Sequence, residues 1–357
     1  GSGKSLIIYS LVRYYESILP KDKKILIIVP TTGLVSQMYN DFKDYSSKNK
    51  WNVDNKCHVI YAGQDKVTEK KVVISTWQSL YKMSEKYFSQ YGAIFGDECH
   101  LFKSKSLTTL MTKLKDCKYR IGTTGTLDGT HTHKLVVEGL FGGVHNVTTT
   151  TKLMEKDLLS KLEIDCINLQ YPMKDIESIK RATYQDEIKW IITHEKRNEF
   201  ITSLCSSMKG NTLLLFNFVE HHGKPLFNRI RSECGDRKVF FIHGGTDTEQ
   251  REYIRKIIDK EKNAILIASY GTCSTGINIK NIHNIFFSSP SKSVVRVLQS
   301  IGRGLRKSND KDHVKLYDIS DNLNFKKYKN HTMRHFDERI KIYNRENFVF
   351  NVLKIKL

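Results

Sequence analysis

The chain has 357 residues, a length that suits two domains of ordinary size better than one. Hydrophobic residues make up 39% and charged residues 27%, as in soluble globular proteins, and the longest apolar runs, such as ILIIV at 25–29, are far too short to span a bilayer. Lysine and arginine (58) outnumber aspartate and glutamate (38), so the formal net charge is +20. That charge favours a polyanionic partner, nucleic acid first, over a basic surface that only keeps the protein in solution.

Seven cysteines, an odd number without a C-x-x-C pair, indicate reduced thiols rather than disulfides or a zinc site. The sequence shows no signal peptide and no lipidation motif, although it does not begin with methionine. We therefore expect a cytoplasmic protein with no membrane partner. Its oligomeric state is left open by the sequence.

The chain opens with GSGKSLIIYS, which contains the right half of the phosphate-loop pattern G-x-x-x-x-G-K-[ST]. The left half of the pattern is absent. A Gly-Ser pair at an N-terminus is also typical of a cloning scar. Two interpretations therefore stay open for these ten residues: half of an ATP site, or a scar beside an accidental lysine.

Five short runs rich in Val, Ile and Phe follow in the first half of the chain. They do not alternate apolar with polar residues, which is typical of strands buried on both faces of a parallel sheet. Helix-like segments such as 33–45 lie between several of them, and this repeated β-α pattern predicts a doubly wound α/β domain. The five runs are 25–30, 58–63, 71–76, 93–98 and 119–126.

The pattern lapses over about 145–195, after which a second series of five apolar runs begins. We expect two α/β halves joined by a connector, with a basic and aromatic tail behind the second half. The runs of the second series are 212–218, 238–244, 264–270, 284–290 and 314–320.

GDECH at 96–100 ends an apolar strand of the first half, and open α/β sheets bind ligands at such strand ends. In a nucleotide hydrolase, Asp97 would hold Mg²⁺ through water, and Glu98 would orient and deprotonate the attacking water. A solvated turn with two acids is the alternative. The next predicted strand ends in TTGT at 123–126, whose hydroxyls are candidates to relay the state of the phosphates; an ordinary glycine turn is the alternative there.

QSIGRGLRK at 299–307 is the most informative stretch of the second half. Arg303 and Arg306 are three residues apart and share a face if the segment is helical. Gly302 and Gly304 permit the close approach of another backbone. An arginine supplied from a facing surface stabilises the charge that develops on a γ-phosphate, whereas a merely basic helical face is the alternative interpretation.

Taken in order, these stretches resemble the motif series of helicase superfamily 2 over nearly the whole chain. In detail they are most similar to the recombination and repair helicases of T4-like bacteriophages. The ordered set carries the resemblance, and no single stretch does. The matching stretches are GKS (3–5), VPTTGLVSQ (29–37), ISTWQSL (74–80), DECH (97–100), TGT (124–126), LLLFNF (213–218), HGGTD (243–247), YGTCSTGIN (270–278) and QSIGRGLR (299–306).

The resemblance implies two tandem RecA-like domains, each a mostly parallel sheet flanked by helices. ATP with Mg²⁺ would bind in the cleft between the domains, and DNA would lie across both. On this plan residues 1–145 form the first domain, 146–195 a connector, 196–325 the second domain and 326–357 a basic C-terminal extension.

The resemblance also implies roles for individual residues. Lys4 would reach the β- and γ-phosphates, and Ser5 would ligate Mg²⁺ together with Asp97, while Glu98 acts as the general base. The nucleotide-binding residues would be Gly1, Ser2, Gly3, Lys4 and Ser5. The residues that couple the two halves would be His100, Thr124, Thr126 and Gln299, and the arginine fingers would be Arg303 and Arg306.

Contacts with the DNA backbone are implied as well, and because backbone contacts carry no base sequence, sequence-independent action is expected. The matching residues are Thr31, Thr32, Thr76, Trp77, Gln78, Thr275 and Gly276. The leading interpretation is therefore an ATP-dependent DNA helicase or translocase that remodels branched or duplex DNA in recombination and repair.

Two other interpretations stay open. An RNA helicase of the DEAD-box kind is the first, although Cys99, His100 and Gln299 depart from the pattern of that group. The second is a nucleic-acid-binding or annealing fragment without a competent ATPase. The family has a strand and a glutamine-containing segment ahead of its phosphate loop, which this sequence lacks, so we expect weak ATP binding and slow hydrolysis from the chain as written.

Overall fold

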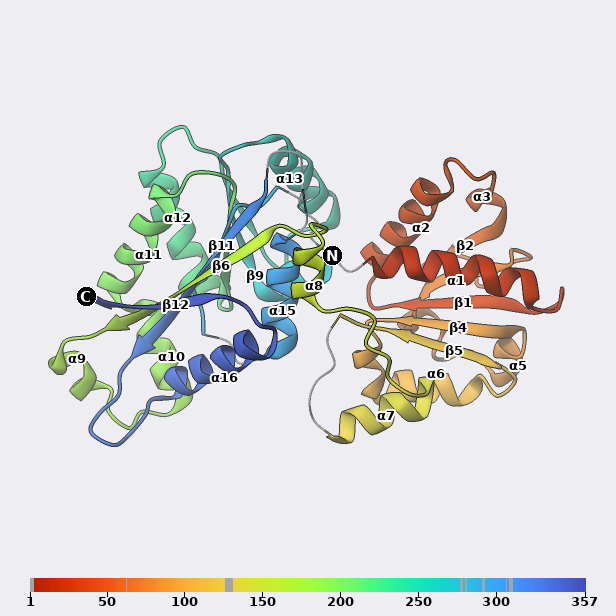
Figure 1. Ribbon diagram of the computed structural model, residues 1–357, viewed down its shortest axis with the longest axis horizontal. Coiled ribbons are helices and arrows are strands. Elements are labelled where there is room, and N and C mark those ends of the chain that lie inside the picture. Colours follow the sequence, from red (N-terminus) through yellow and green to blue (C-terminus); the bar gives the residue numbers. More distant parts are fainter. Residues whose placement is uncertain are drawn as a thin grey trace. The chain divides into compact units, whose positions relative to one another are not determined.

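The computed structural model describes residues 3–61, 63–125, 131–276, 279, 281–290, 293–305, 307 and 311–357. The chain divides into two compact units, an N-terminal unit (Ser2–Val147) and a C-terminal unit (Thr148–Leu357), each shown in Figure 1. No helix among the described residues combines the length and the apolar character that a bilayer crossing requires. In the same residues, no group of three or more His, Cys, Asp or Glu side chains is placed to hold a metal ion.

The N-terminal unit is built on a five-stranded parallel sheet with the order β2-β3-β1-β4-β5. Its strands are β1 (Lys24–Val29), β2 (Cys57–Ile60), β3 (Val72–Thr76), β4 (Tyr91–Asp97) and β5 (Tyr119–Thr123). Its helices are α1 (Lys4–Ile18), α2 (Thr32–Ser46), α3 (Val53–Lys56), α4 (Trp77–Leu80), α5 (Glu85–Phe88), the 3-10 turn η1 (Cys99–Lys103), α6 (Lys105–Lys113) and α7 (His131–Phe141).

Strand β1 is buried on both faces because helices cover this sheet on both sides. Ile25 and Ile27 belong to a core cluster formed with α1 and α2, whereas Leu26 and Ile28 belong to a cluster formed with α6 and α7. Figure 1 shows these two helical layers on opposite sides of the sheet. Because all five strands are parallel, the segments that follow them gather along one edge, where such sheets place their ligand sites.

The C-terminal unit is built on a seven-stranded parallel sheet with the order β12-β6-β11-β10-β7-β9-β8. Its strands are β6 (Lys161–Gln170), β7 (Thr212–Phe216), β8 (Val239–Ile242), β9 (Ile265–Ser269), β10 (Asn284–Phe287), β11 (His313–Asn322) and β12 (Phe350–Lys356). Its helices are α8 (Thr150–Glu155), α9 (Met173–Ser178), α10 (Tyr184–Thr193), α11 (Glu195–Ser207), the helical turn η2 (Val219–Gly223), α12 (Lys224–Glu233), α13 (Thr248–Lys260), α14 (Tyr270–Gly276), α15 (Val294–Gly304) and α16 (His331–Arg345).

The expected fold class is confirmed, because each of the ten apolar runs forms a strand and both sheets are parallel and flanked by helices. In the C-terminal unit, α13 to α16 cover one face of the sheet and α9 to α12 cover the other. All seven cysteines are free thiols, and six of them are buried.

The structure differs from the expected domain plan at two places. The segment 146–195, expected as a connector, contains β6, which pairs with β11 over ten residues inside the second sheet. The segment 326–357, expected as an extension, contains α16 and β12, and β12 pairs with β6. Both segments are therefore integral to the C-terminal unit, because removing either one would leave strand edges and apolar faces of that sheet exposed.

Two fully buried ion pairs fix helices of the C-terminal unit to β11. The guanidinium of Arg197 on α11 donates to both carboxylate oxygens of Asp321, at 2.7 and 3.1 Å. The guanidinium of Arg339 on α16 donates to Asp318 at 2.8 and 3.0 Å, and the Tyr343 hydroxyl donates to the same carboxylate. Buried pairs of this kind set a unique geometry, so α16 is held firmly against the sheet.

Candidate nucleotide and nucleic-acid sites

The nucleotide-site residues of the N-terminal unit meet at the carboxyl edge of its sheet, next to the start of α1. Lys4 is the first residue of α1, and its Nζ donates to Glu98 Oε1 at 2.6 Å, although the two residues are 94 positions apart in the sequence. About a quarter of the Lys4 side chain and a fifth of the Glu98 side chain are exposed. An ammonium and a carboxylate thus face each other where the motif resemblance predicts that the phosphates bind.

Asp97 is the last residue of β4 and is 9% exposed. Burial raises the pKa of its carboxyl above the ordinary value, and neighbouring Glu98 adds to the rise, while Lys4 and the Thr123 hydroxyl work against it. Thr123, paired with Asp97 across β4 and β5, donates its hydroxyl to Asp97 Oδ1 at 3.0 Å. A cation placed at this carboxylate would favour its ionised form.

Glu98 turns the chain out of β4 with a positive φ of 51°, which aims its side chain toward Lys4. Its other oxygen, Oε2, is buried and accepts no hydrogen bond from a described residue, and His100 Nδ1 lies 3.4 Å from it. His100 Nδ1 also lies 2.9 Å from Thr124 Oγ1. A buried carboxylate oxygen without a donor is suited to accept a proton or a water hydrogen, as a general base must.

Gly96 of β4 and Gly122 of β5 pair with each other, and neighbouring side chains pack closely against both of them. A Cβ on Gly96 would come within 2.8 Å of the rings of Phe102 and Phe141, and one on Gly122 would come within 2.9 Å of Cys99. The glycine before Asp97 therefore lets η1 and α7 pack directly on the strands. This packing fixes the backbone that carries the two carboxylates.

The beginning of α1 has the features of an anion site. Gly3 precedes the helix with a left-handed φ of 74°, and its carbonyl accepts the Ile7 amide at 3.0 Å. Ser5 lies in the first turn, and a Cβ on Gly125 would be 3.5 Å from Lys4 Nζ, so Gly125 lies close to the ammonium. The N-terminus of a 15-residue helix with a lysine beside it favours phosphate oxygens. Gly1 and Ser2, expected in the same loop, lie outside the described residues.

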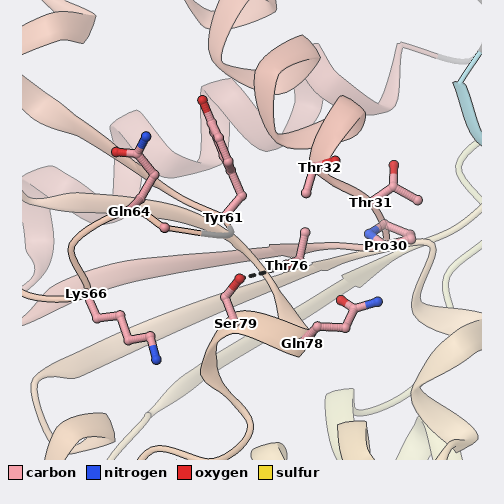
Figure 2. Close-up of a pocket in the computed structure, with 10 residues that line it drawn as sticks. Pro30, Thr31, Thr32, Tyr61, Gln64, Lys66, Thr76, Gln78 and Ser79 are labelled. Carbon is pink, nitrogen blue, oxygen red and sulfur yellow. Dashed lines mark hydrogen bonds between the residues drawn. The ribbon is translucent and has the colours of Figure 1, made fainter. Parts of the chain in front are cut away.

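A second feature of the same edge is a cavity of about 560 Å³ on the side of β1, β2 and β3 (Figure 2). Three segments line it, one after each of these strands, and eight of the ten lining residues carry a hydroxyl, amide or ammonium group. The lining residues are Pro30, Thr31, Thr32, Tyr61, Gly63, Gln64, Lys66, Thr76, Gln78 and Ser79.

Four of the five expected DNA contacts of the first half lie in this cavity. Thr31 and Thr32 begin α2, where the Thr31 hydroxyl also accepts the Leu34 amide, and Thr76 lies opposite them with its hydroxyl 3.0 Å from Ser79 Oγ (Figure 2). Gln78 is exposed at the rim. Trp77, the fifth, does not line the cavity; it packs against Tyr81 and the core cluster below.

Sequence reasoning missed one wall of this cavity, the segment after β2. Tyr61, Gln64 and Lys66 come from that segment, and Lys66 brings a positive charge to a cavity whose other polar groups are neutral. Hydroxyl, amide and ammonium groups are the donors that hold phosphodiester backbones in protein complexes. These residues could have been found from their position, because 58–63 was predicted as a strand of a parallel sheet, and the segment after such a strand reaches the same edge as the other candidate residues.

The expected site residues of the second half are only partly described. Thr275 and Gly276 lie at the end of α14, and Gln299 and Arg303 lie in α15, but nothing is described of their side-chain placement. Arg306 lies outside the described residues, as does Thr126 of the first half. Their roles therefore stay predictions.

The two glycines of this stretch behave differently. A Cβ on Gly304 would lie 2.4 Å from Ile285 of β10, so α15 does approach the sheet closely there, as expected. A Cβ on Gly302 would meet nothing within 4 Å, so close approach does not explain Gly302.

Comparison with known proteins gives consistent matches. The family described as "Type III restriction enzyme, res subunit" matches residues 1–129, and the family described as "Helicase conserved C-terminal domain" matches residues 195–308. The chain is 36% identical over 373 residues to the ATP-dependent DNA helicase uvsW of Enterobacteria phage T4, and the match covers all of this chain and 72% of that protein.

Solved structures show the same fold at low sequence identity. The ATP-dependent Type ISP restriction-modification enzyme LlaBIII bound to DNA is similar with a TM-score of 0.69 at 14% identity, covering the whole of this chain and 29% of that one. Dbp5 of S. cerevisiae bound to RNA and ADP BeF3 is similar with a TM-score of 0.63 at 12% identity, covering the whole of this chain and 83% of that one. At such identities the likeness concerns the fold alone.

Proposed function

This chain belongs to the UvsW-type ATP-dependent DNA helicases of superfamily 2, and from that membership we propose that it is a translocase that remodels branched or duplex DNA in recombination and repair. Its action is independent of base sequence. It uses ATP with Mg²⁺ and works in the cytoplasm, which is that of the host if a phage encodes it.

The observation that carries the catalytic part of the proposal is the contact between Lys4 and Glu98 at 2.6 Å beside the buried Asp97. Lys4 binds phosphate oxygens and has to leave Glu98 when ATP arrives. Glu98 is then released next to the attacking water and takes its proton. The ion pair therefore acts as a resting contact that the nucleotide replaces.

The donor set also fits a magnesium ion. Asp97 and the hydroxyl of Ser5 would hold it, because Mg²⁺ prefers oxygen ligands and usually completes its shell with phosphates and water. Bound there, Mg²⁺ would neutralise charge on the phosphates. The buried Asp97 carboxyl is held in place by Thr123, so it is oriented before the ion binds.

The cavity after β1, β2 and β3 supports the DNA part of the proposal. Thr31, Thr76 and Gln78 offer neutral hydrogen-bond donors at its wall, and Lys66 offers a charge. Hydroxyl and ammonium groups of this kind suit contacts with phosphate and sugar oxygens.

The test is ATP turnover with single-stranded, duplex, forked and four-way DNA, and with RNA of matched length, as separate stimulators. We expect DNA to stimulate turnover and branched DNA to do so best. A Lys66→Ala, Gln78→Ala double variant should lose stimulation while keeping its affinity for ATP, whereas a control Lys48→Ala variant, changed at an exposed lysine of the same unit, should behave like the parent. Stimulation by RNA alone would replace the DNA proposal with an RNA helicase, and turnover that ignores every nucleic acid would refute it.

A further inference from the structure

A tight turn in the C-terminal unit presents two lysines to solvent. Between β11 and α16 the backbone of Phe325 and that of Tyr328 exchange two hydrogen bonds, at 3.0 and 2.9 Å. Lys326 and Lys327 form the tip between them, and both are exposed. The two lysines are therefore accessible at the tip of the turn.

A second basic segment lies against this turn. Lys180 follows α9, and its Nζ is 5.6 Å from the centre of the Phe325 ring, while Lys326 Nζ is 5.5 Å from the same ring. Arg181 is next in the chain and is exposed. Figure 1 shows the blue segment before α16 running beside the green segment that joins α9 to α10.

Aromatic rings continue the same surface. Tyr184 is 42% exposed and its ring lies 6.0 Å from that of His331, which in turn lies 6.4 Å from that of Tyr328. Arg334 places its guanidinium 5.5 Å from the centre of the Tyr328 ring and is exposed. The loop–helix patch is defined by Lys180, Arg181, Tyr184, Phe325, Lys326, Lys327, Tyr328, His331 and Arg334.

Two acidic groups near the loop–helix patch are already occupied. Glu187 is buried and its carboxylate accepts the amides of His331 and Thr332 at the start of α16, at 2.9 and 2.7 Å. Asp337 pairs with Lys329 at 2.5 Å. The N-terminus of α16 is therefore closed to an external anion, and the positive field of the patch comes from its side chains.

We propose that the loop–helix patch is an additional nucleic-acid contact, which binds the phosphate backbone of a DNA arm and stacks an unpaired base on Tyr184. The inference rests on the proposed DNA substrate and adds a contact outside the motif series. Five exposed cations around three rings match a polyanion that carries aromatic bases. Glu187 and Arg339 hold α16, which carries His331 and Arg334, in place before binding.

The test uses charge reversal at Lys326, Lys327 and Arg334 in the full chain. The matched control reverses Lys256, Lys260 and Lys262, three exposed lysines on or just after α13, so that the net charge changes equally. Anisotropy of fluorescein-labelled four-way DNA and of a labelled single strand is measured from about 50 to about 200 mM salt. One lost phosphate contact lowers the salt slope by about 0.9 and the affinity near 0.1 M salt by about tenfold.

We expect the patch variant to lose at least tenfold in four-way junction affinity with a slope lower by about two. Turnover stimulated by a short single strand should stay within about twofold of the parent, because the motif-series contacts are intact. Equal losses in the patch variant and in the α13 control would overturn the proposal, since bulk charge would then explain them. Unchanged junction binding in the patch variant would overturn it too and would favour an acidic protein as partner of the patch.

A second arm tests the stacking. Tyr184→Ala should lower affinity for a strand carrying 2-aminopurine about fivefold and abolish the quenching of that base, whereas Tyr253→Ala, at an exposed tyrosine of α13, should do neither. Quenching that persists in Tyr184→Ala would remove the stacking role. If the parent binds no DNA at all, the proposed function fails; if the parent binds and the patch variants match it, only the further inference fails.

Discussion

The contact between Lys4 and Glu98 predicts opposite effects of one substitution on turnover and on ATP binding. Glu98→Gln keeps the shape of the side chain and its acceptor oxygen but removes the base and the negative charge. Loss of a general base typically slows the chemical step by ~10²–10⁴-fold, which corresponds to about 3–5 kcal/mol of activation free energy. The catalytic constant should fall by that factor.

ATP affinity should rise in the same variant. In the parent, ATP has to displace Glu98 from Lys4, and the pair is short at 2.6 Å with a quarter and a fifth of the two side chains exposed. Ion pairs with this exposure contribute up to about 1 kcal/mol, and removing one competitor of that strength tightens ATP binding about fivefold.

The assay compares steady-state turnover with equilibrium binding of a fluorescent ATP analogue. Glu69→Gln, at an exposed acid of the same unit, serves as the control and should change neither quantity. Thermal unfolding should show that Glu98→Gln remains folded. Near-normal turnover in Glu98→Gln would refute the base assignment, and ATP binding that weakens would refute the resting contact.

Three further predictions concern the remaining charged residues. Burial raises the pKa of the Asp97 carboxyl, so ionised Asp97 opposes folding at neutral pH. Asp97→Asn should therefore raise the Tm of the nucleotide-free protein at pH 7.5, and this gain should disappear below about pH 4, where the carboxyl is protonated in both the folded and the unfolded state. The variant should also no longer be stabilised by Mg²⁺ with ATP. Arg303→Ala or Arg306→Ala should lower kcat by roughly 10³-fold with a smaller effect on ATP affinity, and a variant that only weakens DNA binding would reassign its arginine to a DNA phosphate. With a net charge of +20, single-strand affinity should fall with salt at a log–log slope of about −0.7 per neutralised phosphate and vary little with base sequence; a flat salt response would contradict a backbone-binding site.

The strands could be predicted where the sequence carries continuous apolar runs. The run at 25–30 corresponds to β1, which is buried on both faces, and such burial leaves a pattern that needs no knowledge of the partner strands. Strand β6 was not predicted, because its first three residues, Lys161 to Glu163, are partly or fully exposed and two of them are charged. Strand β12 was not predicted either, because most of its side chains are exposed at the edge of the sheet.

The candidate sites likewise contain residues that the sequence could identify and residues that it could not. Motif resemblance pointed to Asp97, Glu98 and Lys4, but their mutual distances depend on a fold that places the start of α1 beside the end of β4, 94 positions away. Tyr61 and Lys66 were missed because the sequence after β2 matches no motif, and only its position at the end of a parallel strand places it in the cavity. The spacing of residues along the chain does not tell which segments reach the cavity, whereas the strand order of the sheet does.

Strand order also explains how the two sites of the N-terminal unit are related. Strand β1 lies between β3 and β4, so Val29 pairs with Thr76 at the cavity while Ile28 pairs with Gly96 beside the two candidate catalytic carboxylates. Adjacent strands are about 4.8 Å apart, and their backbone hydrogen bonds make the edge stiff. A DNA backbone bound at Thr31 and Thr76 would therefore contact the end of β3 and the start of α2, which are joined through β1 to the strand that carries Asp97 and Glu98. This gives a physical reason to expect that the Lys66→Ala, Gln78→Ala variant loses DNA stimulation of turnover while its basal turnover, which depends on Lys4 and Glu98, stays unchanged.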